Sequence, residues 1–339
     1  MKVISVLCAA CALLFTELAS ASDRLVPSQY PTIQAAINAA VNGDVVQIAQ
    51  GTYAGPIDFA GKAIAVRGAA DPNTVVISGG TWGSPIVRIA TGESATSILE
   101  GVTITGGNSY RSGGGILIES SSPTILNCRV IGNAAGRQDD SGNSLGGFGA
   151  GVYIKDGSPV VSNCLIAANT AYYSGSRGAG VFVSGSSAAR FKACTISGNQ
   201  MTGGGSQVGA GIFIQGTSAS YMPEFEDCLI SGNNLAAGGD ASAMYLGSPV
   251  TLTRCKVSQN GCSYVGGCGG TTGITGTQVF LRDCTFCGSN STVSGPFVDL
   301  GGNRFPQVCD GCVGDLNSDG KIDGADLGIL LSKWGPCSN

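Results

Sequence analysis

The chain has 339 residues and a formal net charge of -4 at pH 7; 12% of its residues are charged and 55 are glycine. This glycine-rich, charge-poor composition indicates a turn-dense β protein, and an apolar share of 43% excludes a disordered low-complexity chain. The absence of histidine excludes Ser-His-Asp and Cys-His catalytic sites and a histidine-ligated zinc, and the absence of a basic cluster argues against a nucleic-acid partner.

Residues 1–21 have the organisation of a secretory leader. Lys2 precedes an apolar run over residues 3–15, and three small residues follow at 19–21. A transmembrane anchor is the alternative, but the run is too short to span a bilayer comfortably, and no later stretch is apolar enough. We therefore predict cleavage after Ala21 and a secreted protein, extracellular or at the cell surface, without a membrane span.

A short amphipathic helix is predicted directly after Pro31, with Thr32 as its N-cap. Gly43 and Asp44 then lead into a strand over Val45–Ile48. Such a helix would cover the open end of a stack of strands, which would otherwise invite aggregation. The apolar residues at helical spacing are Ile33, Ala36, Ile37 and Ala40.

Short β segments follow, and they pass into a repeat that predicts a β solenoid. The segments 63–66, 75–77, 86–89 and 98–104 are separated by Gly, Asn, Pro or Asp. A unit then recurs in which an asparagine stands five positions after a cysteine, and Val102 takes the cysteine position one repeat earlier. Self-similar units with loops of variable length indicate stacked rungs. The copies are Cys128…Asn133, Cys164…Asn169, Cys194…Asn199, Cys228…Asn233 and Cys255…Asn260, with a degenerate copy from Cys284.

The cysteines after the leader form two groups, and export would place them in an oxidising compartment. Six occupy the repeat column, where each shares a face with an apolar residue two positions later, so we expect them to point inward. Disulfides between rungs are the alternative, which the side-chain directions disfavour. The column asparagines are expected at turns, with left-handed backbone and amides bonded along the stack. The cysteines outside the column are Cys262, Cys268, Cys287, Cys309, Cys312 and Cys337.

Charged residues stand directly before the column cysteines on three repeats. These are Asp227, Arg254 and Asp283. We interpret them as a solvated ladder of opposite charges on adjacent strands. A catalytic pair of Asp227 and Asp283 is the alternative, but Arg254 between them would hold both ionised, which suits a salt bridge better than a general acid.

The loops after each asparagine are the variable part of the repeat and are expected to project from one edge. On three consecutive rungs they carry aromatic residues, arginines and adjacent acids. Stacked together, these would form a carbohydrate-facing patch; ordinary polar loops on a scaffold are the alternative. The candidate binding residues are Tyr110, Tyr172 and Tyr173, and the weaker candidate catalytic residues are Arg111, Arg137, Asp139, Asp140 and Arg177.

The C-terminal residues 309–339 contain a predicted calcium loop followed by a helix. Oxygen ligands at alternating positions suit a hard cation, Gly320 provides the turn, and Lys321 contributes a backbone carbonyl. Cys309 or Cys312 bonded to Cys337 would staple so small a module. The predicted calcium ligands are Asp315, Asn317, Asp319, Lys321, Asp323 and Asp326.

Two parts of the sequence resemble known families. The helix segment TIQAAINAA with the following GDVVQIAQGTY resembles the N-terminal cap of right-handed parallel β-helix proteins of the pectin-lyase-like superfamily. The calcium loop is similar to a type I dockerin repeat, of which family members usually carry two and this chain carries one. The resemblance implies an all-β, right-handed parallel β-helix over 22–308 with an N-terminal capping helix, and a dockerin-like EF-hand module over 309–339. It also implies a possible cohesin-like partner, although Gly324 and Ala325 stand where dockerins commonly carry hydroxylated recognition residues.

Three functions are compatible with these patterns. The first is a secreted β-helix that binds polysaccharide or another surface polymer and is attached through the calcium module. The second, implied by the superfamily, is a calcium-dependent polysaccharide lyase in which Asp139 and Asp140 hold calcium and Arg111, Arg137 or Arg177 is the base. The third is a structural or adhesion protein without a small-molecule site. Histidine-dependent hydrolysis, as in polygalacturonases, is excluded.

Overall fold

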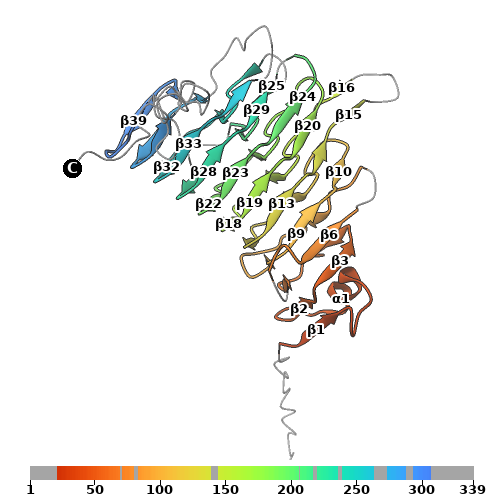
Figure 1. Cartoon of the computed structure of the whole chain (residues 1–339). Coiled ribbons are helices and arrows are strands. Elements are labelled where there is room, and N and C mark those ends of the chain that lie inside the picture. The colour runs from red at the N-terminus through yellow and green to blue at the C-terminus, as the bar shows by residue number, and fades with distance from the viewer. Residues whose placement is uncertain are drawn as a thin grey trace, which may run out of the picture.

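The computed structural model describes residues 21–68, 71–79, 83–138, 144–205, 207–216, 220–235, 239–262, 273–287 and 293–306. The described chain forms one short helix, α1 (Ile33–Ala39), and strands stacked rung upon rung into an elongated solenoid (Figure 1). Thr32 caps α1, because its hydroxyl oxygen accepts the amide hydrogen of Ala35 at 3.1 Å. Ile33, Ala36 and Ile37 are buried, which confirms the predicted helix and its apolar face.

Four parallel sheets, named A to D below, run along the described solenoid. Along the chain, each full rung passes through them in the order C, A, B, D. Sheet A contains β1 (Asp23–Val26), β2 (Val45–Ile48), β5 (Ala65–Gly68), β8 (Ile98–Glu100), β12 (Thr124–Leu126), β18 (Val160–Ser162), β22 (Arg190–Lys192), β27 (Glu224–Glu226), β32 (Val250–Thr253), β36 (Val279–Arg282) and β39 (Phe297–Asp299). Sheet B contains β3 (Gly51–Ala54), β6 (Val75–Ser78), β9 (Thr103–Thr105), β13 (Arg129–Ile131), β19 (Leu165–Ala167), β23 (Thr195–Ser197), β28 (Leu229–Ser231), β33 (Lys256–Ser258) and β37 (Thr285–Cys287).

Sheets C and D complete each rung. Sheet C contains β4 (Ile57–Asp58), β7 (Val87–Ile89), β11 (Ile116–Glu119), β17 (Val152–Lys155), β21 (Val181–Ser184), β26 (Ile212–Ile214), β31 (Met244–Leu246), β35 (Ile274–Gly276) and β38 (Val293–Ser294). Sheet D contains β10 (Asn108–Ser109), β14 (Ala134–Ala135), β20 (Thr170–Tyr172), β24 (Gln200–Thr202), β29 (Asn234–Leu235) and β34 (Gly261–Cys262). Two strand pairs lie in the loops: β15 (Arg137–Gln138) with β16 (Ser144–Leu145), antiparallel, and β25 (Gln207–Val208) with β30 (Gly239–Asp240), parallel.

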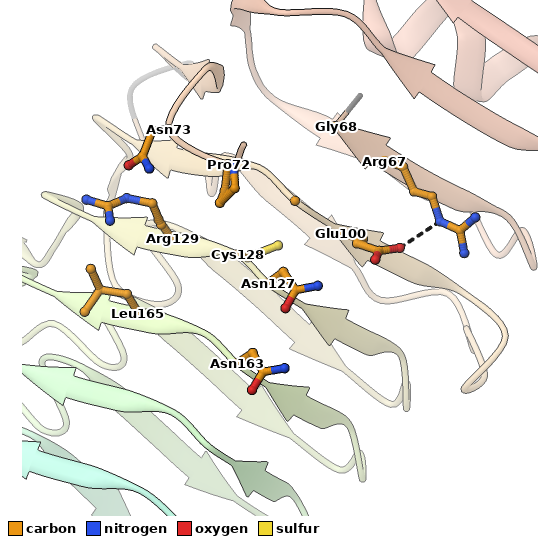
Figure 2. A pocket seen from close by; sticks show the side chains of 11 residues that line it. Arg67, Gly68, Pro72, Asn73, Glu100, Asn127, Cys128, Arg129, Asn163 and Leu165 are labelled. Atoms are coloured by element: carbon orange, nitrogen blue, oxygen red, sulfur yellow. Dashed lines mark ion pairs between the residues drawn. The ribbon is translucent and has the colours of Figure 1, made fainter. Parts of the chain in front are cut away.

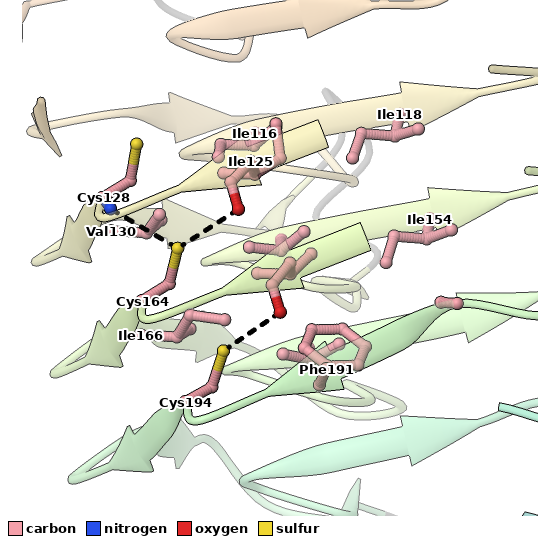
Figure 3. Close-up of a cluster of buried hydrophobic side chains, with 14 of the residues drawn as sticks. Ile116, Ile118, Ile125, Cys128, Val130, Ile154, Cys164, Ile166, Phe191 and Cys194 are labelled. Atoms are coloured by element: carbon pink, nitrogen blue, oxygen red, sulfur yellow. Dashed lines mark hydrogen bonds between the residues drawn. The ribbon is translucent and has the colours of Figure 1, made fainter. Parts of the chain in front are cut away.

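The cysteine column is part of the core. All six column cysteines are unpaired and buried, and Val102 stacks in the same column because Arg129 pairs with Thr103. Figure 3 shows three of these thiols one above another. The sulfur of Cys164 accepts the amide hydrogen of Cys128 at 3.4 Å and lies 3.7 Å from the Ile125 carbonyl oxygen, to which it donates. The predicted inward orientation is therefore confirmed.

The asparagine column forms a continuous ladder of buried amides. The side-chain nitrogen of Asn169 donates to the side-chain oxygen of Asn199 at 2.9 Å, and that of Asn199 donates to Asn233 at the same distance. The bonding along the stack is as predicted, but the expected left-handed backbone is not at these residues. It falls one position earlier, for example at Gly132 (φ 63°) and Ala168 (φ 53°). The residue before the asparagine therefore makes the turn, and the asparagine amide stabilises it through hydrogen bonds.

The expected single strand over 98–104 is two strands, β8 and β9. Gly101 between them has φ 68°, and this left-handed residue turns the chain from sheet A to sheet B. An apolar run bridging a tight corner has the same sequence signature as one longer strand, which explains the error. On later rungs the same corner is made by Asn127, Asn163, Ala193, Asp227, Arg254 and Asp283, all with φ between 51° and 54°.

Candidate functional site

The loops that follow sheet D fold back over the outer face of sheet C. Single parallel bridges connect Ser112 to Phe148, Phe148 to Arg177, and Arg177 to Val208. These loop residues therefore stack with the same rung spacing as the sheets. The sequence predicts loops that project from one edge; the loop residues joined by these bridges instead form an additional layer over sheet C.

An aromatic ladder lies beneath this layer. Tyr153, Phe182, Phe213 and Tyr245 occupy one outward column of sheet C, and their rings stack at centroid distances of 5.1, 5.5 and 5.2 Å, with the planes within 4° of parallel. Phe148 from the loop layer stacks on Phe182 at 5.3 Å. Such offset-stacked rings add to the stability gained by burial. On these rungs the outer face of sheet C is an apolar packing surface.

Two of the candidate catalytic arginines pack against aromatic rings. The guanidinium carbon of Arg111 lies 5.2 Å from the centroid of Phe148, and that of Arg177 lies 5.1 Å from the centroid of Phe213. These are cation–π distances, so both guanidinium groups contribute to the packing of the loop layer on the aromatic rings. The backbone of Arg137 belongs to β15, while its side chain, Asp139 and Asp140 lie outside what the structure describes.

Two of the candidate tyrosines stand exposed in one column. Strands β10, β14 and β20 pair in register, and the residues directly after the paired positions are Tyr110, Gly136 and Tyr172. Tyr110 is 41% exposed and Tyr172 is 40% exposed. A side chain on Gly136 (φ 108°) would place its Cβ 2.6 Å from the Tyr172 carbonyl oxygen, so the rung between them carries no side chain. Tyr173 is partly buried, with its ring 6.3 Å from that of Tyr172.

The charged residues before the column cysteines form an ionic ladder. Arg254 Nε lies 2.6 Å from one carboxylate oxygen of Asp227, and its Nη2 lies 2.9 Å from the other; Arg254 also pairs with Glu226. Hydrogen bonding to Arg254 lowers the pKa of Asp227 below its usual value. The interpretation as a salt-bridge ladder is confirmed for this pair, since a general acid needs a raised pKa.

A polar groove at the corner between sheets A and B was not predicted from the sequence. It encloses about 820 Å³ and is lined by residues of β5, β8, β13 and β19, by the turns Gly101, Asn127 and Asn163, and by the segment with Pro72 and Asn73 (Figure 2). Its lining residues are far apart in sequence and meet only because the rungs stack. The available sequence signal was an asparagine directly before the cysteine on two successive repeats, at positions 127 and 163.

The charged side chains that line the groove are Arg67, Glu100 and Arg129. Arg67 Nε lies 2.8 Å from a carboxylate oxygen of Glu100. This contact is ionic only, because its geometry leaves the buried Nε–H of Arg67 without a hydrogen-bond acceptor. Arg129 points outward from sheet B, in register with Thr103 and Leu165. The groove therefore contains one ion pair with no net charge, Arg67–Glu100, and one further positive charge on Arg129.

The predicted metal ligands of residues 309–339 lie outside the described part of the chain. Among the residues that are described, no group of three or more Cys, Asp or Glu side chains is placed to hold a metal ion. Within the same residues no helix is long and apolar enough to cross a membrane. Cys287, beside the end of the cysteine column, is disulfide-bonded.

Stacked parallel strands, inward columns and variable loops define a parallel β-solenoid that presents its loops and corners to solvent. The family model described as "Right handed beta helix region" matches residues 39–178 and 141–292, which together cover most of the chain. The chain belongs to this right-handed β-helix family, which confirms the predicted fold class. The division at residues 21 and 308 stays a prediction.

Several solved structures are similar to the chain at low identity. A pectin methylesterase from Aspergillus niger is 15% identical, with a TM-score of 0.47, over 90% of this chain and 94% of that one. Pectate lyase Pel9A is 14% identical, with a TM-score of 0.44, over 85% and 80%. An alginate lyase from Paenibacillus sp. is 15% identical, with a TM-score of 0.37, over 84% and 98%. Likeness at this level says nothing about what the chain binds, and no curated protein matches its sequence.

Proposed function

We propose that the protein is a secreted β-helix that binds a polysaccharide or another surface polymer along the edge beside sheet D. The observation that carries the proposal is the pair of exposed tyrosines, Tyr110 and Tyr172, two rungs apart in one column with Gly136 between them. Two rungs of about 4.8 Å each separate their backbones by roughly 9.6 Å. An extended polymer crossing this edge would meet both rings.

The chemistry of the edge suits sugars. A tyrosine has an apolar ring face on which the C–H face of a sugar ring can pack, and a hydroxyl that can hydrogen-bond to the sugar. The glycine between the two rings leaves space for a polymer to lie flat against the backbone. The neighbouring loops are backed by the aromatic ladder on the outer face of sheet C, so the edge is built on a packed layer and loses little conformational entropy on binding.

Calcium at the C-terminal loop is part of the proposal. Asp315, Asn317, Asp319, Asp323 and Asp326, with the carbonyl of Lys321, would hold one calcium ion and shape the module. A cohesin-like protein is the proposed partner of that module. Together the two parts would hold a bound polymer at a cell surface or in an extracellular assembly.

The experiment compares polymer binding by three tyrosine variants of the full chain. Retention on a panel of immobilised plant, algal and bacterial polysaccharides identifies the polymer. Tyr110→Ala and Tyr172→Ala should each weaken its binding about tenfold, because each removes one stacking ring. Tyr221→Ala is the matched control, since Tyr221 is 39% exposed and precedes β27 on a different face. Equal losses in all three variants, or no retained polymer, would contradict the proposal.

A further inference from the structure

The groove between sheets A and B carries an uncompensated positive charge. Arg67 and Glu100 neutralise each other as an ion pair. Arg129 is partly buried, and its guanidinium makes no hydrogen bond, ion pair or ring contact with any residue in the described ranges. The lining therefore has a net charge of +1 on a chain whose overall charge is -4. A guanidinium in a concave site presents a planar fork of donors that matches a carboxylate.

The two corner amides of the groove are also available to a ligand. The side chains of Asn127 and Asn163 are exposed and have no partner among the residues that the structure places. Their left-handed backbone does not account for the choice of asparagine, because Ala193 and Arg254 adopt the same conformation at equivalent corners. Each amide offers both a donor and an acceptor, the pair that a sugar hydroxyl requires.

Glycines keep the groove open at its N-terminal end. A Cβ on Gly68 would lie 2.2 Å from the carbonyl oxygen of Gly101, so no other residue fits there without moving the backbone. Gly101 makes its corner without a side chain, whereas the next two corners carry the amides. The resulting volume of about 820 Å³ falls in the range of small-molecule sites.

We infer that this groove binds the carboxylate of an acidic saccharide. Arg129 pairs with the carboxylate, and Asn127 and Asn163, on successive rungs, hydrogen-bond to the sugar hydroxyls. The Arg67–Glu100 pair forms the opposite wall and limits how far the sugar can shift. The groove is formed by different strands and turns from the tyrosine edge, so the inference does not rest on the proposed function.

The test uses glucuronic acid and glucose, two sugars that differ only in the carboxylate at C6, with acetate as the free anion. Saturation-transfer NMR on the full chain measures their binding. Glucuronic acid should bind and glucose should bind at least tenfold more weakly. Arg129→Gln should weaken glucuronate binding about tenfold or more, and Asn163→Ala by a smaller factor. Raising the salt concentration should weaken the wild-type interaction, because Arg129 is accessible to counterions.

Arg282→Gln is the matched control, because it removes the same charge from an exposed position on β36, far along the stack from the groove. Circular dichroism of each variant verifies that the β-helix is folded. Equal effects of Arg129→Gln and Arg282→Gln would overturn the inference, as would wild-type chain that binds glucose as well as glucuronic acid. Acetate binding as tight as glucuronate would overturn the saccharide part. Loss of glucuronate binding in Tyr110→Ala would place the sugar at the edge beside sheet D and would likewise overturn the inference.

Discussion

Two column cysteines in the middle of the stack, Cys194 and Cys228, are unreactive thiols. Hydrogen bonding to the neighbouring thiol, with burial adding to it, raises the pKa of both Cys194 and Cys228 from the ordinary 9.0 to about 12. At neutral pH these thiols are protonated, and the thiolate is the form that reacts. Their place in the core makes them equivalents of Val102, which fills the same column one rung before Cys128.

The raised pKa values predict a loss of stability in alkali. Below pH 9 the folded and unfolded chains both keep the thiol protons, so stability does not depend on them. Between pH 9 and about 12 only the unfolded chain releases them, which favours unfolding by about 1.4 kcal/mol per pH unit and thiol. Urea unfolding of the double variant Cys194→Val, Cys228→Val should therefore show a flatter decline between pH 9 and pH 10.5 than wild type. Parallel declines would contradict these shifts.

At the scale of elements, the amide ladder fixes the corner between sheets B and D. Asn199 donates to the Ile166 carbonyl oxygen at 3.0 Å and to Asn233, and it accepts from the backbone and side-chain nitrogens of Asn169. The chain of bonds runs between rungs, perpendicular to the strands' own direction. The ladder therefore couples neighbouring rungs independently of the sheets.

Removing one amide should weaken the whole stack. Asn199→Ala removes the side-chain hydrogen bonds to Asn169, Asn233 and the Ile166 carbonyl and leaves the buried backbone N–H of Asn169 without its acceptor. We expect a loss of roughly 2–4 kcal/mol in unfolding free energy. Asn163→Ala is the control, since its side chain is exposed and Ala193 already occupies an equivalent corner. Its cost should stay below about 1 kcal/mol. Chemical denaturation measures both, and similar losses would show that the ladder is not a source of stability.

The repeat allowed the stacked strands to be predicted from the sequence, but it did not reveal the groove between sheets A and B. A cysteine and an asparagine at fixed spacing are enough to align the rungs, because one register buries every apolar column at once. The corner at Gly101 was missed because the apolar run continues through it. The packing of Arg111 and Arg177 on aromatic rings could not be predicted from the sequence, because Phe148 and Phe213 lie on other segments. An asparagine directly before the cysteine marks two corners of the groove in the sequence, but Arg129 and Asn163 become neighbours only through strand pairing, so this local pattern does not identify the groove.

At the scale of the whole molecule, binding surfaces and packing surfaces lie on different sides of the same rungs. The outer face of sheet C is covered by the loop layer, and its aromatic ladder is nearly buried. The tyrosine edge lies at the end of sheet D where the loop layer begins, and the corner groove lies at the junction of sheets A and B. Because each rung contacts only its neighbours, substitutions in one surface should leave the other intact. Polymer binding and glucuronate binding are therefore separable measurements.

The same independence predicts how the calcium module behaves. Asp319 would be the central carboxylate of the loop, so Asp319→Ala should abolish calcium uptake by the C-terminal module, because a hard cation loses a charged oxygen ligand there. The β-helix should keep its unfolding midpoint, since its rungs are held by their own neighbours. Isothermal titration of the full chain with calcium measures the uptake. Asp283→Ala is the control, because it removes an exposed carboxylate from a β-helix corner where Ala193 shows that alanine fits. Undiminished uptake by Asp319→Ala would refute the calcium loop, and loss of the β-helix in that variant would refute the independence of the two parts.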